Sequence, residues 1–253
     1  MSGLVARLTS QLAAPADFSA VLAGSWTALT VKELSGRPVM LGGRTAVPLG
    51  ELCAIAGRPD GSLRFSGDFR SAARLGARLT EGKVTIEGGV GDEVGLGMEG
   101  GAIEILGDAG ARAGAAAPEA RRGMTGGELV VHGAVGDGAG ALMRRGLLAV
   151  GGRCGDHAGA GMIAGTIVSV GPLGTAAGLW SKRGSIVALG GVTISATYRY
   201  ACTYQPTYLR LVLTRLRTVY GLAIDAPHFT GSYRRFSGDL ADLGKGEILE
   251  WTA

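Results

Sequence analysis

Residues 127–190 read GELVVHGAVGDGAGALMRRGLLAVGGRCGDHAGAGMIAGTIVSVGPLGTAAGLWSKRGSIVALG and contain four copies of one short pattern. Each copy starts with a glycine, continues with a strand-like segment, and reaches a second glycine six residues after the first. With three upstream copies the full set is GSLRFSG from Gly61, GKVTIEG from Gly82, GAIEILG from Gly101, GELVVHG from Gly127, GLLAVGG from Gly146, GTIVSVG from Gly165 and GSIVALG from Gly184. The opening glycines are 21, 19, 26, 19, 19 and 19 residues apart, which identifies an internal repeat with a dominant period of 19.

Apolar residues recur at fixed places within the copies. The second residue after each opening glycine is always apolar: Leu63, Val84, Ile103, Leu129, Leu148, Ile167 and Ile186. The intervening positions admit charged residues such as Arg64 and Glu104, so each copy has the period-two alternation of a strand with one buried face. One copy is too short to bury that face alone, and the copies must stack. We therefore predict an all-β fold, a right-handed parallel β-helix (β-solenoid) of about seven glycine-cornered coils.

A second glycine pattern, G-x-x-G-x-x-x-G, follows five of the copies. The triples are Gly88, Gly91, Gly95; Gly107, Gly110, Gly114; Gly133, Gly136, Gly140; Gly152, Gly155, Gly159; and Gly171, Gly174, Gly178. Glycine at a corner permits positive φ and lets neighbouring turns approach without a clashing Cβ. After Gly114 the spacing is longer, which places a seven-residue insertion within AAAPEARRGMTGG.

The glycines also indicate the domain organisation. Of 46 glycines in 253 residues, 34 lie between residues 61 and 191. We predict an N-terminal cap over 1–60, a repeat domain over 61–191 and a C-terminal cap over 192–253 that covers one open end. Within the last region, TYLRLVLTRLRTVYG has an apolar stripe that predicts an amphipathic capping helix near 207–220.

Composition and short motifs exclude several function classes. Hydrophobic residues make up 46% and charged residues 18%, which argues against disorder. No apolar run is long enough for a membrane helix, and MSGLVARLTS has no secretory signal pattern, so we expect a cytoplasmic protein that does not contact membranes. GLGMEG from Gly95 matches a dinucleotide motif, but the repeat already explains it. No aromatic residues interleave with the basic ones, so we expect no nucleic-acid partner.

Cys154 and His157, in CGDH, lie three residues apart on one glycine corner. A thiol beside an imidazole can act as a nucleophile and base, but the surrounding sequence has no recognisable oxyanion element or orienting group. We therefore interpret both as exposed corner residues without a catalytic role and expect no catalytic residue in this chain. An independent hydrolase that uses Cys154 and His157 is kept as an alternative. No histidine or cysteine has a metal-ligand spacing, so we expect no metal site.

Two basic pairs occupy the same place in the repeat. Arg144 and Arg145 precede the strand at Gly146, and Lys182 and Arg183 precede the strand at Gly184, two copies later. In a stacked fold they project from one edge about 10 Å apart, with Ile163 and Ala164 between them. These four residues are our candidate binding ridge for an acidic partner or a carboxylate-rich carrier tail, and a solvated face is the alternative. We consider Arg121 and Arg122 in the insertion as further members.

The repeats over 61–191 resemble the GxGxG-repeat β-helix, a fold known in two settings. One is the C-terminal domain of the glutamate synthase large subunit. The other is the C-subunit of formylmethanofuran dehydrogenase, together with its bacterial counterpart, the C-subunit of the formyltransferase/hydrolase complex. The terminal RRFSGDLADLGKGEIL, from Arg234 to Leu249, is similar to these C-subunits. We therefore favour the formyltransferase/hydrolase setting, in tetrahydromethanopterin-linked one-carbon metabolism.

The resemblance implies a scaffold subunit that organises catalytic partners. Those partners are amidohydrolase-like and formyltransferase chains, with a molybdopterin-subunit-like chain in the hetero-oligomer, and a molybdenum or tungsten pterin only in the archaeal enzymes. No cofactor is expected on this chain alone, and a methanofuran-type formyl carrier is expected at the level of the complex. A glutamate-synthase-type structural domain is the alternative. The sequence leaves open the identity of the carrier, the presence of a redox pterin subunit, the stoichiometry, and which surface docks which partner.

Overall fold

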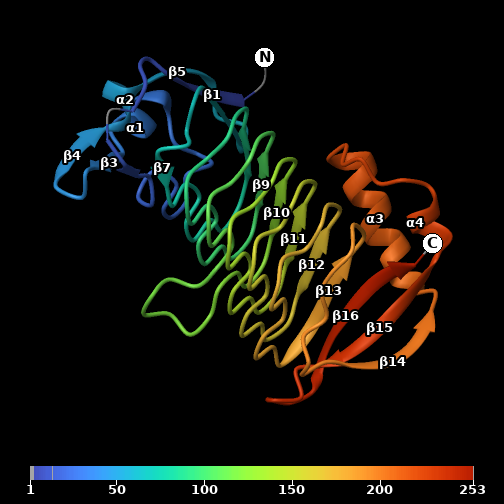
Figure 1. Cartoon of the computed structure of the whole chain (residues 1–253). Helices are drawn as coiled ribbons and strands as arrows, with labels where there is room; N and C mark the ends of the chain where they lie inside the picture. Colours follow the sequence, from blue (N-terminus) through green and yellow to red (C-terminus); the bar gives the residue numbers. More distant parts are fainter. Residues whose placement is uncertain (1–2, 13, 253) are drawn as a thin grey trace.

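The computed structural model of the chain describes residues 3–12 and 14–252, and one large sheet dominates it (Figure 1). Residues 1, 2, 13 and 253 of the two predicted caps lie outside the described residues. The sheet has twelve strands in the order β14-β15-β16-β13-β12-β11-β10-β9-β8-β6-β1-β5. The bounds are β1 Gly3–Leu8, β5 Cys53–Arg58, β6 Ser62–Ser66, β8 Lys83–Ile86, β9 Ala102–Ile105, β10 Glu128–Val131, β11 Leu147–Val150, β12 Thr166–Ser169, β13 Arg183–Ala188, β14 Arg199–Tyr204, β15 Ser232–Gly238 and β16 Lys245–Thr252.

The seven repeat copies form β6 and β8 to β13, which pair in parallel with their neighbours along the chain. The register aligns equivalent residues of successive copies, for example Leu129 with Leu148 and Leu148 with Ile167. All seven residues at this position are buried, at 2% exposure or less. Full burial of one such aliphatic side chain stabilises the fold by about 1.5–3 kcal/mol. The predicted mainly β fold is therefore confirmed. The prediction of a single buried face is wrong for β10 to β13, because the outward-facing Val130, Ala149, Val168 and Val187 are fully buried as well.

A second line of contacts runs beside the sheet. Single parallel bridges connect Phe69, Val90, Ala109, Val135, Cys154, Leu173 and Val192 in sequence. Asp137 and Asp156 reinforce this side, because each carboxylate accepts a hydrogen bond from the backbone N–H of the residue 19 positions later, at 2.8 Å. Each repeat thus contacts its neighbours at two places, the strand and the corner.

The corner glycines serve two different purposes. Gly159 has a φ of +68°, a conformation that an L-residue with a Cβ adopts only at a cost. Gly171 is required for close approach instead: a Cβ there would meet the carbonyl oxygen of Gly152 and lie 2.5 Å from its carbonyl carbon. Glycine therefore sets both the turn and the spacing between neighbouring repeats.

Both predicted caps continue the sheet. At the N-terminal end β1 pairs in parallel with β6 and antiparallel with β5. A smaller sheet in the order β4-β3-β2-β7 lies at this end with two short helices. Their bounds are β2 Ala16–Asp17, β3 Pro38–Leu41, β4 Thr45–Pro48, β7 Ala72–Ala73, α1 Val31–Ser35 and α2 Leu49–Leu52. At the C-terminal end β16 pairs in parallel with β13, and β15 and β14 follow as antiparallel strands.

The C-terminal helix differs from its prediction in where it packs. Helix α3, Thr207–Val219, lies over the outer face of the sheet, and a short helix α4, Pro227–Thr230, follows it (Figure 1). Its buried Leu209, Leu213 and Leu216 share a core cluster with Val130, Ala149, Val168 and Val187 of β10 to β13. The helix therefore covers a face, while β16, β15 and β14 cover the end. The physical reason is that the outward-facing residues of β10 to β13 are apolar, and packing α3 against them removes them from water.

None of the helices in the described part of the chain combines the length and the apolar character that crossing a membrane would require.

Candidate functional site

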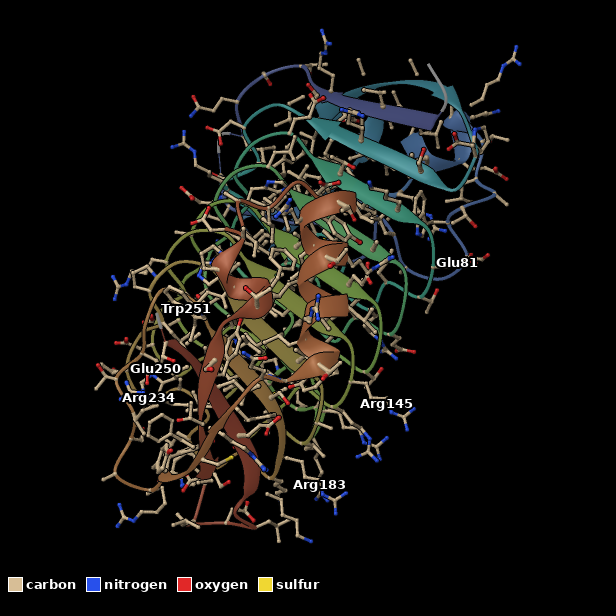
Figure 2. The ribbon with its side chains drawn as sticks, turned by 90° about the vertical axis from the view of Figure 1, so that its right-hand side faces the viewer. Glu81, Arg145, Arg183, Arg234, Glu250 and Trp251 are labelled. Carbon is tan, nitrogen blue, oxygen red and sulfur yellow. The ribbon has the colours of Figure 1, made fainter. Side chains whose placement is uncertain are left out.

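The basic ridge predicted from the repeat spacing lies along one edge of the sheet. Arg145 precedes β11 and Arg183 begins β13, and Figure 2 shows both side chains on the same edge. Strands β11, β12 and β13 are consecutive in the sheet, so the two arginines are two strands apart, about 10 Å. Ala164 stands between them and interrupts the row of charge. Arg144 and Lys182 are their chain neighbours, and together the four residues are called the basic ridge below.

Most of the basic ridge is unpaired. Among residues 3–12 and 14–252, the only ion pair of a ridge residue within 4 Å joins Lys182 Nζ and Asp242 Oδ2, at 3.7 Å. The register of β13 and β16 also aligns Arg183 with Lys245. Sequence reasoning missed Lys245, although Gly246-Glu247-Ile248-Leu249 repeats the pattern of glycine followed by alternating residues. Lys245 therefore lengthens the basic row at the C-terminal end.

The same edge is acidic nearer the N-terminus. Figure 2 places Glu81 on this edge, before β8. The hydroxyls of Ser25 and Thr27 donate hydrogen bonds to Glu81 Oε1, at 3.1 and 2.8 Å, and hold the carboxylate. The equivalent residues of the next two repeats are Gly100 and Gly126, which carry no charge. The arginines of this edge thus lie in the C-terminal half of the stack, where an acidic ligand would be attracted.

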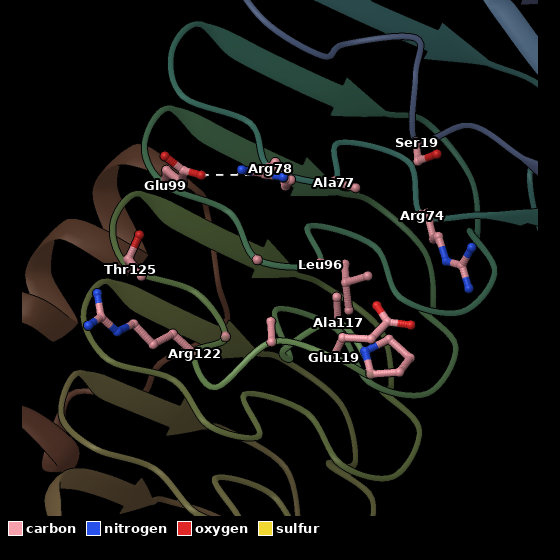
Figure 3. Close-up of a pocket in the computed structure, with 14 residues that line it drawn as sticks. Ser19, Arg74, Ala77, Arg78, Leu96, Glu99, Ala117, Glu119, Arg122 and Thr125 are labelled. Atoms are coloured by element: carbon pink, nitrogen blue, oxygen red, sulfur yellow. Dashed lines mark ion pairs between the residues drawn. The ribbon is translucent and has the colours of Figure 1, made fainter.

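The insertion forms a separate feature. The segment after Gly114 borders a pocket of about 690 Å³, and Arg122 lines it with Arg74 and Arg78 (Figure 3). Its other lining residues include the apolar Ala77 and Leu96. None of the four ridge residues lines this pocket. Arg121 is exposed on the same insertion. The structure therefore gives Arg122 different surroundings from the basic ridge.

A ladder of ion pairs fixes one wall of this pocket. Glu93 accepts hydrogen bonds from Arg74 at 2.7 Å and from Arg112 at 3.1 Å, and Arg74 also contacts Asp17. Burial alone raises the pKa of Glu93, but the two guanidinium groups outweigh it and hold that pKa below its ordinary value. Arg74 is thus already neutralised and serves to join the repeats to the N-terminal region.

The structure separates Cys154 from His157. The expectation that Cys154 is an exposed corner residue is wrong, because its side chain is fully buried. Burial with the nearby Asp137 carboxylate raises the pKa of its thiol to about 12. His157 is exposed, and the hydrogen bonds of the described residues include none between the two side chains. The reason is positional, because Cys154 belongs to the buried column of Val135 and Leu173. A catalytic Cys154–His157 pair would need an ionised thiol in contact with the imidazole. The raised pKa of the thiol and the missing hydrogen bond both argue against this alternative.

A charged cluster that the sequence did not reveal joins α3 to the sheet. Arg215 donates two hydrogen bonds to Glu128, at 2.6 and 2.9 Å, and the hydroxyl of Tyr220 donates a third. Glu128 begins β10 and is 87 residues before Arg215, so no local pattern predicts the pairing. Burial raises the pKa of Glu128, yet these hydrogen bonds outweigh it and hold that pKa below its ordinary value of 4.5.

Replacing Glu128 by glutamine is expected to lower the free energy of unfolding by about 1 kcal/mol at pH 7, because Arg215 loses its charged partner. The lowered pKa in the folded state means that the carboxylate stabilises the fold above pH 4.5, and that this contribution disappears as the pH falls through the folded-state value. Urea unfolding of both proteins between pH 3 and pH 7 measures it. Curves that differ equally at all pH values would contradict this explanation.

Groups of three or more His, Cys, Asp or Glu side chains arranged to hold a metal ion do not occur among the described residues.

Comparison with known proteins relates the chain to a solved structure. No protein-family model and no curated protein matches the chain. Among solved structures, the chain is similar to a chain in the X-ray crystal structure of the formyltransferase/hydrolase complex (FhcABCD) from Methylorubrum extorquens in complex with methylofuran. The two share 32% sequence identity with a TM-score of 0.80, and the alignment covers 98% of this chain and 100% of that chain.

Proposed function

Because this chain belongs to the same family as the matched chain of the FhcABCD formyltransferase/hydrolase complex, we propose that it is the scaffold subunit of such a complex, corresponding to the C-subunit. The observation that carries the proposal is the end-to-end match, which includes the C-terminal strands and helix as well as the repeats. In this proposal the amidohydrolase-like and formyltransferase chains carry the chemistry, and this chain holds them.

The geometry supports a rigid spacer. The large sheet and the second line of bridges are interpreted as two walls of one right-handed β-helix, whose seven coils are closed by glycine corners. The coils share one continuous core, so the chain forms a stiff rod with long side faces. Such faces can hold several partners at fixed separations.

The basic ridge is proposed to receive carboxylates at the level of the complex. The matched structure is of a complex with methylofuran. A carrier of the methanofuran type with a glutamate-rich tail would find Arg144, Arg145 and Arg183 without ion pairs to the described residues, since the ion pair found there belongs to Lys182. The exposed guanidinium groups of Arg145 and Arg183, with the half-buried Arg144 beside them, attract a polyanion over a distance of about one Debye length. Guiding the carrier between active sites of neighbouring subunits is the proposed role of this edge, and an acidic partner surface is the other ligand considered for it.

Replacing Arg144, Arg145, Lys182 and Arg183 by alanine is expected to raise the KM of the assembled complex for its formyl carrier about tenfold at low salt, with kcat unchanged. Added salt screens the electrostatic attraction in the parent complex. The KM difference between the variant and the parent complex should therefore disappear at high salt. Replacing the exposed Arg44 and Arg58 by alanine removes charge at the other end of the chain and serves as the control. Unchanged assembly together with unchanged carrier affinity would remove the ridge as the binding site.

The scaffold role is tested by assaying this chain alone and the remaining subunits with and without it. The purified chain should not hydrolyse the formyl carrier, whereas the set of remaining subunits should regain activity when this chain is added. Hydrolysis by the isolated chain would overturn the proposal in favour of an independent enzyme.

A further inference from the structure

An exposed apolar cluster lies at the C-terminal end of the stack. Trp180, Leu240 and Leu243 are 61%, 54% and 52% exposed, and they are among the few large apolar side chains at the surface. Two contacts hold the chain segments that carry these residues next to each other. The backbone N–H of Trp180 donates to Asp239 Oδ2 at 2.8 Å, and Lys182 Nζ lies 3.7 Å from Asp242 Oδ2. These contacts fix the loop between β15 and β16, red in Figure 1, against the corner before β13.

Trp180 occupies a backbone conformation that disfavours it. Its φ is +57°, in the left-handed region where a bulky residue is an outlier. The equivalent positions in the two preceding repeats, each 19 residues earlier, hold Gly161 and Leu142, at φ of +64° and +59°. Glycine would therefore satisfy the fold at position 180, as it does at position 161. Because the repeat imposes a positive φ at this corner whichever residue is present, it is the exposure of the large aromatic side chain that indicates a use outside the folding of the monomer.

Charged residues of both signs surround the cluster, since Asp239 and Asp242 flank Leu240 and Asp242 already pairs with Lys182. Lys182 and Arg183 lie two and three residues after Trp180 in the chain, and the rest of the basic ridge continues from there along the edge. Tryptophan and arginine are the residues most enriched where protein interfaces derive their affinity, and isolated Leu side chains beside them add apolar area. A purely carboxylate tail has no apolar group to cover Trp180, whereas a protein surface does.

We propose that Trp180, Leu240 and Leu243 dock into an apolar pocket of another subunit, and that an Asp or Glu side chain at the rim of this pocket pairs with Arg183, while Arg144 and Arg145 stay accessible to the carrier. The inference rests on the proposed scaffold function and assigns the subunit contact to one corner of the chain. A second copy of this chain is a poor occupant, because a two-fold contact would bring the same basic edge against itself.

The decisive variant is Trp180→Gly. It removes the side chain but keeps the N–H that donates to Asp239, and glycine suits the positive φ, so the fold is not expected to lose stability. Arg78→Gly is the matched control, since Arg78 is exposed with a φ of +55° at an equivalent corner near the other end of the stack. Each variant is mixed with the subcomplex of the remaining formyltransferase/hydrolase subunits. The dissociation constant is measured by biolayer interferometry, and the urea midpoint of each isolated variant is recorded in parallel.

Trp180→Gly should weaken binding at least about 30-fold with an unchanged urea midpoint, while Arg78→Gly binds like the parent chain. Parent-like binding by Trp180→Gly would overturn the docking inference and leave the scaffold function standing. If the parent chain itself fails to bind the subcomplex, the proposed function fails and the inference with it. If the isolated chain forms a dimer and Trp180→Gly abolishes that dimer, the corner contacts a second copy of this chain. That result would also overturn the proposal.

Discussion

Replacing Gly171 by alanine is expected to lower the free energy of unfolding by about 3 kcal/mol. The added Cβ would meet the carbonyl oxygen of Gly152 and lie 2.5 Å from its carbonyl carbon, and both atoms belong to the backbone of the preceding repeat. Because no flexible side chain can move aside, two neighbouring repeats must separate. Equilibrium urea unfolding, followed by circular dichroism, measures the change.

Gly36→Ala is the control for this substitution. Gly36 has a negative φ of −78°, and a Cβ there would lie 3.6 Å from the nearest atom, an ordinary contact. Its unfolding midpoint should stay close to that of the parent chain. A loss below about 0.5 kcal/mol for Gly171→Ala would mean that neighbouring repeats are not in the close backbone contact described above.

Val168→Asp is expected to have the second large effect, a loss of about 4 kcal/mol at pH 7, because it buries an unpaired carboxylate beneath α3. Val168 is fully buried on the outer face of β12, in the same cluster as Leu213 and Leu216 of the helix. The helix must lift from the sheet or the carboxyl group must stay protonated, and either costs stability. The loss should shrink at pH 4, where protonation is easier.

Thr85→Asp is the matched control for Val168→Asp. Thr85 has the equivalent outward position in β8, is only half-buried, and lies between Arg64 and Glu104 in the register. The new carboxylate faces a guanidinium on one side there, so its cost should stay below about 1 kcal/mol. If both variants lose the same free energy of unfolding, the outer face of β8 is covered as well as that of β10 to β13, which would contradict the observed position of α3.

The strands were predictable because their signal is local and repeated. Seven copies of a glycine followed by alternating residues specify both the strands and their parallel alignment, since equal spacing aligns equal positions. The packing of α3 was not predicted, although a signal exists in Val130, Ala149, Val168 and Val187. These outward residues are apolar in consecutive copies, which indicates a covered face. Strand β16 was missed because β14, α3 and β15 separate it in the chain from the last tandem copy. Its parallel pairing with β13 arises only when the chain folds.

Only those site residues that occupy equivalent positions of the repeat were predictable from the sequence. The spacing of Arg145 and Arg183 predicted a shared edge, and the structure has it. The orientation of Cys154 was also readable, because Val135 and Leu173 occupy the same repeat position and are apolar. The contacts of Trp180 with Asp239 and of Glu128 with Arg215 join residues 59 and 87 apart, and only the folded chain brings them together.

The most direct measurement of the central claim is affinity purification of this chain from its native host, with the bound proteins identified and quantified by mass spectrometry. The account predicts that formyltransferase and amidohydrolase-like subunits co-purify in fixed ratio to it, and that the isolated chain shows no hydrolysis of the formyl carrier. Recovery of amidotransferase or flavin subunits in their place, or hydrolysis by the chain alone, would contradict it.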